Sequence, residues 1–110
     1  MRIFKVILVK PSHYDDDGYV VQWRRSLIPS NSLANVHGLI RDCADEQVLG
    51  PNTRIEIEAY DECNWRVDVR KLARAVRRAD AGFVGLVGVQ SNQFPRALDL
   101  GRAFRAEDVS

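Results

Sequence analysis

The order of apolar and polar positions along the chain predicts three strands that alternate with three helices. Residues 3–9 are almost continuously apolar, which is typical of a strand that is covered on both faces. Residues 53–60 alternate apolar and charged side chains, so one face of that strand is expected to contact water. Residues 81–89 are apolar throughout, which indicates a strand inside the sheet.

A segment with helical spacing follows each predicted strand. Asn31 or Ser32 is suited to cap the first helix, and Pro95 is suited to the first turn of the third. The second helix, after residue 68, has an apolar side and a basic side, which is typical of a solvated outer face. In the third helix, we expect these side chains to face the sheet: Ala97, Leu98, Gly101 and Phe104.

Three strand–helix units with right-handed crossovers predict a parallel sheet with strand order 2-1-3. The predicted fold class is therefore α/β, a three-layer flavodoxin-like (Rossmann-like) sheet. In that order the apolar third strand lies at an edge of the sheet, and complete proteins avoid such an exposed edge. We therefore expect residues 1–110 to be the N-terminal part of a larger domain, or to rely on a partner.

Composition narrows the function classes. Sixteen basic and fifteen acidic residues give a net charge of +1, which does not favour a nucleic-acid partner. No apolar run approaches the roughly 18 residues of a membrane span. Cys43 and Cys63 do not have the spacing of a metal or redox motif, so they are expected to be small buried hydrophobic residues and not a disulfide or a metal site, in a cytoplasmic protein.

The loop after the first strand carries most of the candidate chemistry. His13 is followed by aspartates at 15–17, which suggests a metal ligand with carboxylates behind it, or an acid–base group of a small enzyme. An aspartate run before Gly18 is also typical of a turn. A phosphoryl-accepting receiver domain is excluded, because Gln90 and Ser91 follow the third strand where its acceptor aspartate is needed. Glu62 is expected to be a solvated strand end.

Three segments together resemble the N-terminal cobalamin-binding domain of B12-dependent radical SAM proteins. They are residues 10–19 (KPSHYDDDGY) with Trp23, residues 29–34 (PSNSLA), and residues 87–97 (VGVQSNQFPRA). The resemblance implies that the corrin lies over the carboxyl ends of the strands. It implies the following cofactor-binding residues: Pro11, Ser12, His13, Tyr14, Ser30, Asn31, Gln90, Ser91 and Asn92. Tyr14, Tyr19 and Trp23 would cover the apolar face of the corrin.

The same resemblance implies a radical SAM barrel downstream in the same polypeptide, which would hold a 4Fe–4S cluster and S-adenosylmethionine. That barrel is absent from this chain, so the chain alone is not expected to be catalytic. The parent enzyme would transfer a methyl group or rearrange a substrate by radical chemistry.

The sequence departs from cobalamin domains that carry D-x-H-x-x-G, where the histidine is the lower ligand of cobalt. If His13 is aligned with that histidine, Pro11 falls at the aspartate position and Asp16 at the glycine position. His13 is therefore not supported as a cobalt ligand. The alternative function is a cofactor-free interaction module that pairs through its open sheet edge.

Overall fold

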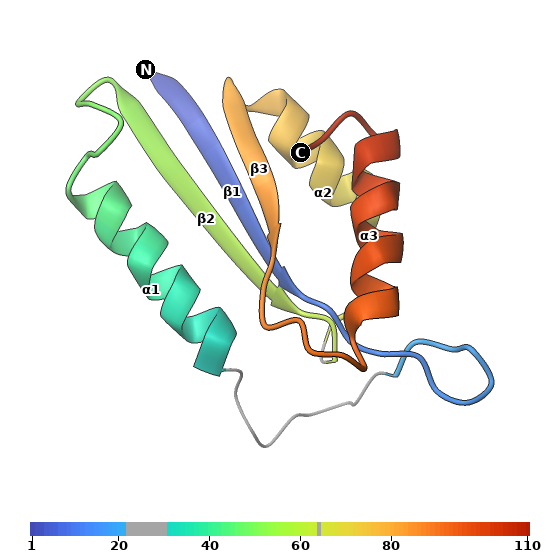
Figure 1. The fold of residues 1–110 in the computed structure, drawn as a ribbon. Coiled ribbons are helices and arrows are strands. Elements are labelled where there is room, and N and C mark those ends of the chain that lie inside the picture. The colour runs from blue at the N-terminus through green and yellow to red at the C-terminus, as the bar shows by residue number, and fades with distance from the viewer. Residues whose placement is uncertain (22–30, 64) are drawn as a thin grey trace.

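The computed structural model describes residues 1–21, 31–63 and 65–110 (Figure 1). Strands and helices alternate as the sequence predicts. The elements are β1 (Arg2–Lys10), α1 (Asn31–Asp45), β2 (Thr53–Asp61), α2 (Val69–Arg78), β3 (Ala81–Leu86) and α3 (Phe94–Ala106). None of the described helices combines the length and the apolar character that crossing a membrane requires.

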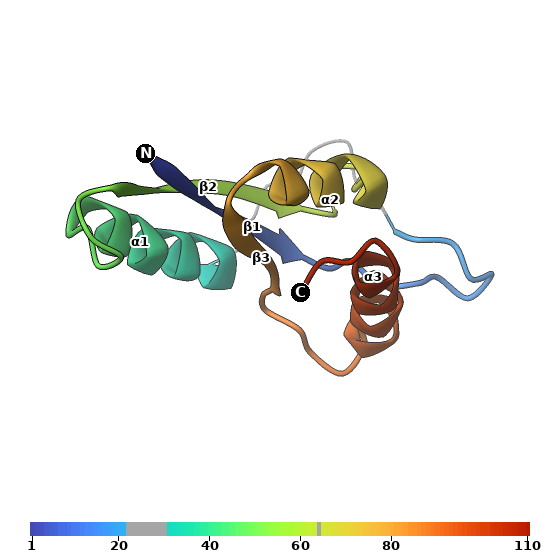
Figure 2. The same cartoon turned by 90° about the horizontal axis from the view of Figure 1, so that it is seen from above.

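The sheet has the order β2-β1-β3, and both strand pairs are parallel. Val6 of β1 is the register partner of Ile57 in β2 and of Phe83 in β3. Figure 2 shows α1 on one side of the sheet and both α2 and α3 on the other. The predicted three-layer α/β fold of the flavodoxin-like type, with strand order 2-1-3, is confirmed, and the sheet is incomplete relative to that type.

The main core lies between the sheet and the layer formed by α2 and α3. It consists of Ile7, Val9, Leu72, Ala73, Val76, Leu100, Phe104 and Val109. Alternate residues of a strand point to opposite faces, so Val6 and Leu8 are buried on the α1 side. On that side Phe4 and Phe83 also meet edge to face, with 6.0 Å between ring centroids. Asp68 caps the start of the short α2, because its carboxylate accepts a hydrogen bond from the backbone N–H of Lys71.

One face of β2 carries charged side chains, as predicted. Lys5 Nζ lies 3.3 Å from Glu58 and 3.8 Å from Glu56, whose side chains are 41% and 33% exposed. Tyr60 follows Glu58 on the same face of β2, and its hydroxyl donates a hydrogen bond to the Glu58 carboxylate. Burial, reinforced by the Glu58 carboxylate, raises the pKa of the Tyr60 phenol above its ordinary value.

Two sequence predictions need correction. The third strand ends at Leu86 instead of residue 89, because the backbone turns at Gly88, where φ is +69°. In α3, Leu98 is 41% exposed and Leu100 is buried instead. The buried positions of this helix are 97, 100 and 104, so residue 98 lies off the stripe that faces the sheet.

Candidate functional site

The carboxyl ends of β1 and β3 mark the point where the chain connections diverge to opposite faces of the sheet. Ligands of open α/β sheets bind at such a point. Gly88 lies in this region, close to the first turn of α1 and to the end of β1. A Cβ atom at residue 88 would stand 3.2 Å from the Ser32 Cβ and 3.6 Å from the Lys10 Cε. Glycine therefore permits both the positive φ and this close approach.

Pro11 and Ser12, at the start of the loop after β1, are fully buried. The backbone N–H of Ser12 donates to Glu62 Oε1 at 3.0 Å, and its hydroxyl donates to the carbonyl of Val21. The Pro11 carbonyl accepts a hydrogen bond of 2.9 Å from Gln93 Nε2. The polar groups of the predicted site residues Pro11 and Ser12 are therefore bonded within the protein, and these bonds hold the loop in place.

Glu62, directly after β2, is 1% exposed and pairs with Arg96 in the first turns of α3. Arg96 Nε donates to Glu62 Oε1 at 2.9 Å, and a terminal guanidinium nitrogen donates to Oε2 at 2.7 Å. This two-pronged geometry is the strong form of the arginine–carboxylate pair. Its hydrogen bonds raise the pKa of Arg96 further above its already high value, although partial burial acts in the opposite direction.

The prediction that Glu62 is a solvated strand end is therefore wrong. The reason is that α3 brings an arginine over the end of β2, so the carboxylate is compensated within the protein. We refer to Ser12, Glu62, Gln93 and Arg96 together as the clamp, because their contacts join the loop after β1 to β2 and α3.

Tyr14 extends the clamp. Its hydroxyl donates to Asp99 of α3, and the Arg96 guanidinium carbon lies 5.8 Å from the centre of its ring. Arg96 also lies within hydrogen-bond distance of the Tyr14 hydroxyl, at 3.4 Å. The tyrosine ring is therefore engaged by α3, which does not fit the predicted role of covering a corrin face. Tyr19, which had the same predicted role, is 73% exposed, and Trp23 lies outside the described residues.

His13 and the aspartates that follow it form a turn. His13 is half-buried, and its carbonyl accepts from the backbone N–H of Val21 at 2.9 Å. Asp15 Oδ1 accepts from the backbone N–H groups of Asp17 and Tyr19, which confirms the turn before Gly18 that the sequence predicts. Within the described ranges, no group of three or more His, Cys, Asp or Glu side chains is suited to hold a metal ion.

The β3 side of the edge is open. Gln90, Ser91 and Asn92 are all exposed, and they follow the end of β3 in a turn. The backbone N–H of Gln90 donates to Gln93 Oε1 at 3.0 Å, so the clamp also fixes the base of this turn. The predicted site residue Ser30 lies outside the described residues. Asn31 is the first residue of α1, and its side chain is not among those that the structure describes.

Sequence reasoning missed the roles of Gln93 and Arg96, although both fall in the 87–97 segment. The two cysteines are free thiols, with no disulfide between them, but both are only half-buried, and Cys63 Sγ lies 3.6 Å from the Ser12 hydroxyl beside the clamp. Comparison with protein-family models, with curated proteins and with solved structures gives no match for this chain. Functional inference therefore rests on the chain's own residues.

Proposed function

We propose that this chain is the cobalamin-binding module of a B12-dependent radical SAM enzyme, with the corrin over the carboxyl edge between β1 and β3. The observation that carries the proposal is the hydrogen bond from Gln93 Nε2 to the Pro11 carbonyl. It joins two of the segments on which the resemblance rests, across 82 residues of sequence. Their contact at the edge where α/β sheets bind ligands supports a shared role in one site.

The open turn supplies the groups that suit a corrin. A corrin carries amide side chains around its rim, and the amides of Gln90 and Asn92 and the hydroxyl of Ser91 are exposed donors and acceptors for them. His13, Ser30 and Asn31 belong to the same proposed contact set. The clamp and Asp99 already bond the polar groups of Pro11, Ser12 and Tyr14. In this proposal these three residues therefore shape the site and do not themselves hydrogen-bond to the corrin.

Bound cobalamin would supply a cobalt centre that carries a methyl group or takes part in radical chemistry. The residues of this chain fit the rim of the corrin and not the metal, since His13 lacks the D-x-H-x-x-G context. In this proposal a radical SAM domain of the same polypeptide holds the 4Fe–4S cluster and S-adenosylmethionine. The reaction takes place there, in the cytoplasm, and this module only holds the corrin.

The test is a titration of the purified chain with hydroxocobalamin, read by its visible spectrum and by co-elution in gel filtration. We expect a saturable spectral change and retained cofactor. Ser91→Trp puts a large side chain into the open turn and should abolish uptake, while circular dichroism stays that of the wild type. The matched control is Asn52→Trp, an exposed turn position at the opposite end of the sheet, which should bind normally.

Two results would contradict the proposal. A folded wild-type chain that neither changes the cofactor spectrum nor retains the cofactor is not a cobalamin module. Equal uptake by Ser91→Trp and Asn52→Trp would mean that any cobalamin binds away from the proposed edge.

A further inference from the structure

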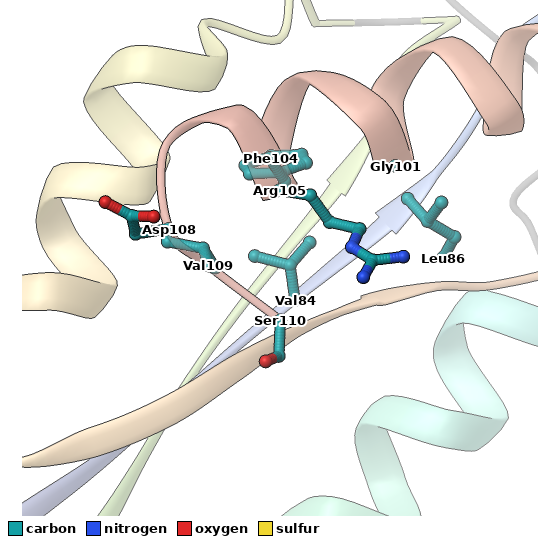
Figure 3. A pocket seen from close by; sticks show the side chains of 8 residues that line it. All are labelled: Val84, Leu86, Gly101, Phe104, Arg105, Asp108, Val109 and Ser110. Carbon is teal, nitrogen blue, oxygen red and sulfur yellow. The ribbon is translucent and has the colours of Figure 1, made fainter.

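A cavity of about 480 Å³ lies between β3 and α3 (Figure 3). Its lining is mainly apolar and includes Val84 and Leu86 of the strand and Phe104 of the helix. The chain's own residues 108–110 also line it, and the backbone N–H of Val84 donates to the carbonyl of Ser110 at 2.8 Å. The cavity therefore belongs to the packing of the segment that follows α3, and it does not present a separate binding surface.

The outer side of α2 carries a row of positive charges. Leu72, Ala73 and Val76 of this helix are buried in the core, and Figure 2 shows the helix in the outer layer opposite to α1. Six exposed basic residues on and just before the helix form what we call the basic face: Arg66, Arg70, Lys71, Arg74, Arg77 and Arg78. Positions three and four apart on a helix are neighbours, so the five that lie in α2 make one continuous stripe.

Acidic side chains neutralise only part of the basic face. Glu107, directly after α3, lies 3.7 Å from Arg70 and 3.4 Å from Arg77. Among the residues that the structure describes, no carboxylate lies within 4 Å of the other four cations, which are Arg66, Lys71, Arg74 and Arg78. Most of the positive charge on this face therefore has no counter-ion in the described part of the chain.

A purely structural role does not account for the basic face. The helix dipole favours cations in the last turn, which explains Arg77 and Arg78. Like charges four residues apart, such as Arg70 with Arg74 and Arg74 with Arg78, instead destabilise a helix. Unpaired charges also resist burial, so this face is unsuited to packing against a further layer of the fold, however the polypeptide continues. The face therefore fits a ligand that supplies several negative charges.

An exposed tryptophan stands next to the basic face. Trp65, which precedes Arg66, is 64% exposed, and its backbone N–H donates to the carbonyl of Asp61 at 3.0 Å, so the turn after β2 holds it. Arg66 itself lines two hollows, one of about 460 Å³ at the first turn of α2 and one of about 310 Å³ beside Glu62 and Arg96. An exposed indole offers a flat apolar surface on which a nucleic-acid base can stack.

We propose that the basic face and Trp65 bind single-stranded nucleic acid. The arginine and lysine side chains contact phosphates along α2, and an unpaired base stacks on Trp65. Five of the six cations are arginines, whose planar guanidinium group matches phosphate oxygens with two hydrogen bonds. A duplex keeps its bases stacked on one another and would leave the Trp65 ring without a partner, which favours a single strand.

The net charge of +1 does not argue against this partner, because the charges are unevenly distributed. Residues 66–78 contain six basic residues and one acidic residue, so the rest of the chain contains ten basic and fourteen acidic residues. Charges farther apart than the Debye length, about 10 Å at 0.1 M salt, are largely screened from each other, so a phosphate responds mainly to the local charge. The proposal is independent of cobalamin, since no residue of the proposed corrin contact set belongs to the basic face.

The test is a titration of fluorescein-labelled decauridylate with the purified chain, read by fluorescence anisotropy at several salt concentrations. We expect a saturable increase, and contacts from the four unpaired cations should give a slope of about −3 for log K against log salt concentration. Arg74→Gln should weaken binding about fivefold and make the slope shallower by about 0.7. The matched control is Arg41→Gln, an exposed arginine of α1 on the other side of the sheet, which should bind as the wild type does.

Trp65→Ala tests the stacked base. Loss of one stacking contact should weaken binding of the single strand at least about fivefold. Because the side chain is exposed, the circular dichroism spectrum should stay that of the wild type. The control is Tyr19→Ala, which removes an aromatic side chain that is 73% exposed and lies outside the basic face, and its affinity should not change.

Three results would overturn the proposal. One is a folded wild-type chain that leaves the anisotropy of the oligonucleotide unchanged. Another is equal affinity of Arg74→Gln and Arg41→Gln, or of Trp65→Ala and Tyr19→Ala. The third is equally tight binding of a labelled polyglutamate peptide with the same charge as the oligonucleotide, since the partner is then an acidic protein segment. Cobalamin takes no part in these measurements, so this proposal and the cobalamin proposal can fail separately.

Discussion

The two halves of the carboxyl edge carry similar residue types but are built differently. On the β1 half, Pro11 and Ser12 are buried, and their polar groups bond to Glu62 after β2, to Gln93 before α3 and to Val21 of the loop itself. On the β3 half, Gln90, Ser91 and Asn92 are exposed. The first half is fixed by contacts within the protein, and the second leaves its polar side chains exposed. Position at a strand end alone does not distinguish the two roles.

The clamp explains why the β1 half is closed. Each residue fixed in a loop costs about 1–2 kcal/mol of backbone conformational entropy, so a loop held in one conformation needs compensating contacts. Here the contacts come from Glu62 and Gln93, which lie far from the loop in sequence. The turn after β3 needs fewer contacts because it is short and leads directly into α3.

The largest loss in the free energy of unfolding is expected from Glu62→Gln, which changes the closed β1 half. Glutamine keeps the shape but removes the charge, which leaves the partly buried Arg96 guanidinium without its counter-ion. Loss of one partner from a buried pair costs about 3–5 kcal/mol, and the 20% exposure of Arg96 places this case near or below the lower limit. We expect a loss of about 2–3 kcal/mol in the free energy of unfolding, measured by urea denaturation.

Glu58→Gln is the matched control. It removes the same charge from the exposed face of β2, where the Glu58 side chain is 41% exposed and pairs with Lys5. Exposed pairs contribute about 0–1 kcal/mol. If the two glutamines destabilise the protein equally, the clamp does not differ energetically from a surface pair.

An intermediate effect is expected from Gln93→Ala. The substitution removes the donor to the Pro11 carbonyl, which is a clamp contact, and the acceptor of the Gln90 backbone N–H, which fixes the base of the turn after β3. Leaving buried polar groups unpaired costs about 1–3 kcal/mol. Gln90→Ala, three residues away and exposed, should change the unfolding free energy by less than about 0.5 kcal/mol. Urea denaturation of both variants measures the difference, and equal losses would contradict the assignment of Gln93 to the clamp.

The fold was predictable from local patterns. Continuous apolar runs at β1 and β3 and the alternation in β2 correctly gave the strand order, because burial of each strand depends on its place in the sheet. Pro95 located the start of α3 to within one residue, whereas Asn31 and Ser32, the predicted caps, are the first two residues of α1 itself. The boundary of β3 was missed because Gly88 turns an apolar segment that has no polar break.

The division of roles at the edge was not predictable from one sequence. Glu62 and Arg96 are 34 residues apart, and nothing in the local pattern of either residue indicates that the Arg96 side chain will reach Glu62. The backbone N–H of Ser12 likewise depends on a residue distant in sequence, since it donates to Glu62. Residue type and strand-end position indicated only a region, and the long-range contacts show which of its side chains are already bonded within the protein.

The smallest expected change in unfolding free energy comes from Tyr14→Phe, at the border of the two halves, compared with Tyr19→Phe at an exposed position. Tyr14→Phe removes the hydrogen bond to Asp99 and the 3.4 Å contact from Arg96 to the hydroxyl, but keeps the aromatic ring beside Arg96 and the bonds between Arg96 and Glu62. Since Asp99 is exposed, water replaces the lost donor, and we expect a loss of about 0.5–1 kcal/mol in urea denaturation. Tyr19→Phe removes a hydroxyl from a side chain that is 73% exposed and should have no measurable effect. A loss in Tyr14→Phe as large as in Glu62→Gln would mean that the Tyr14 hydroxyl, and not the ion pair, holds the loop against α3.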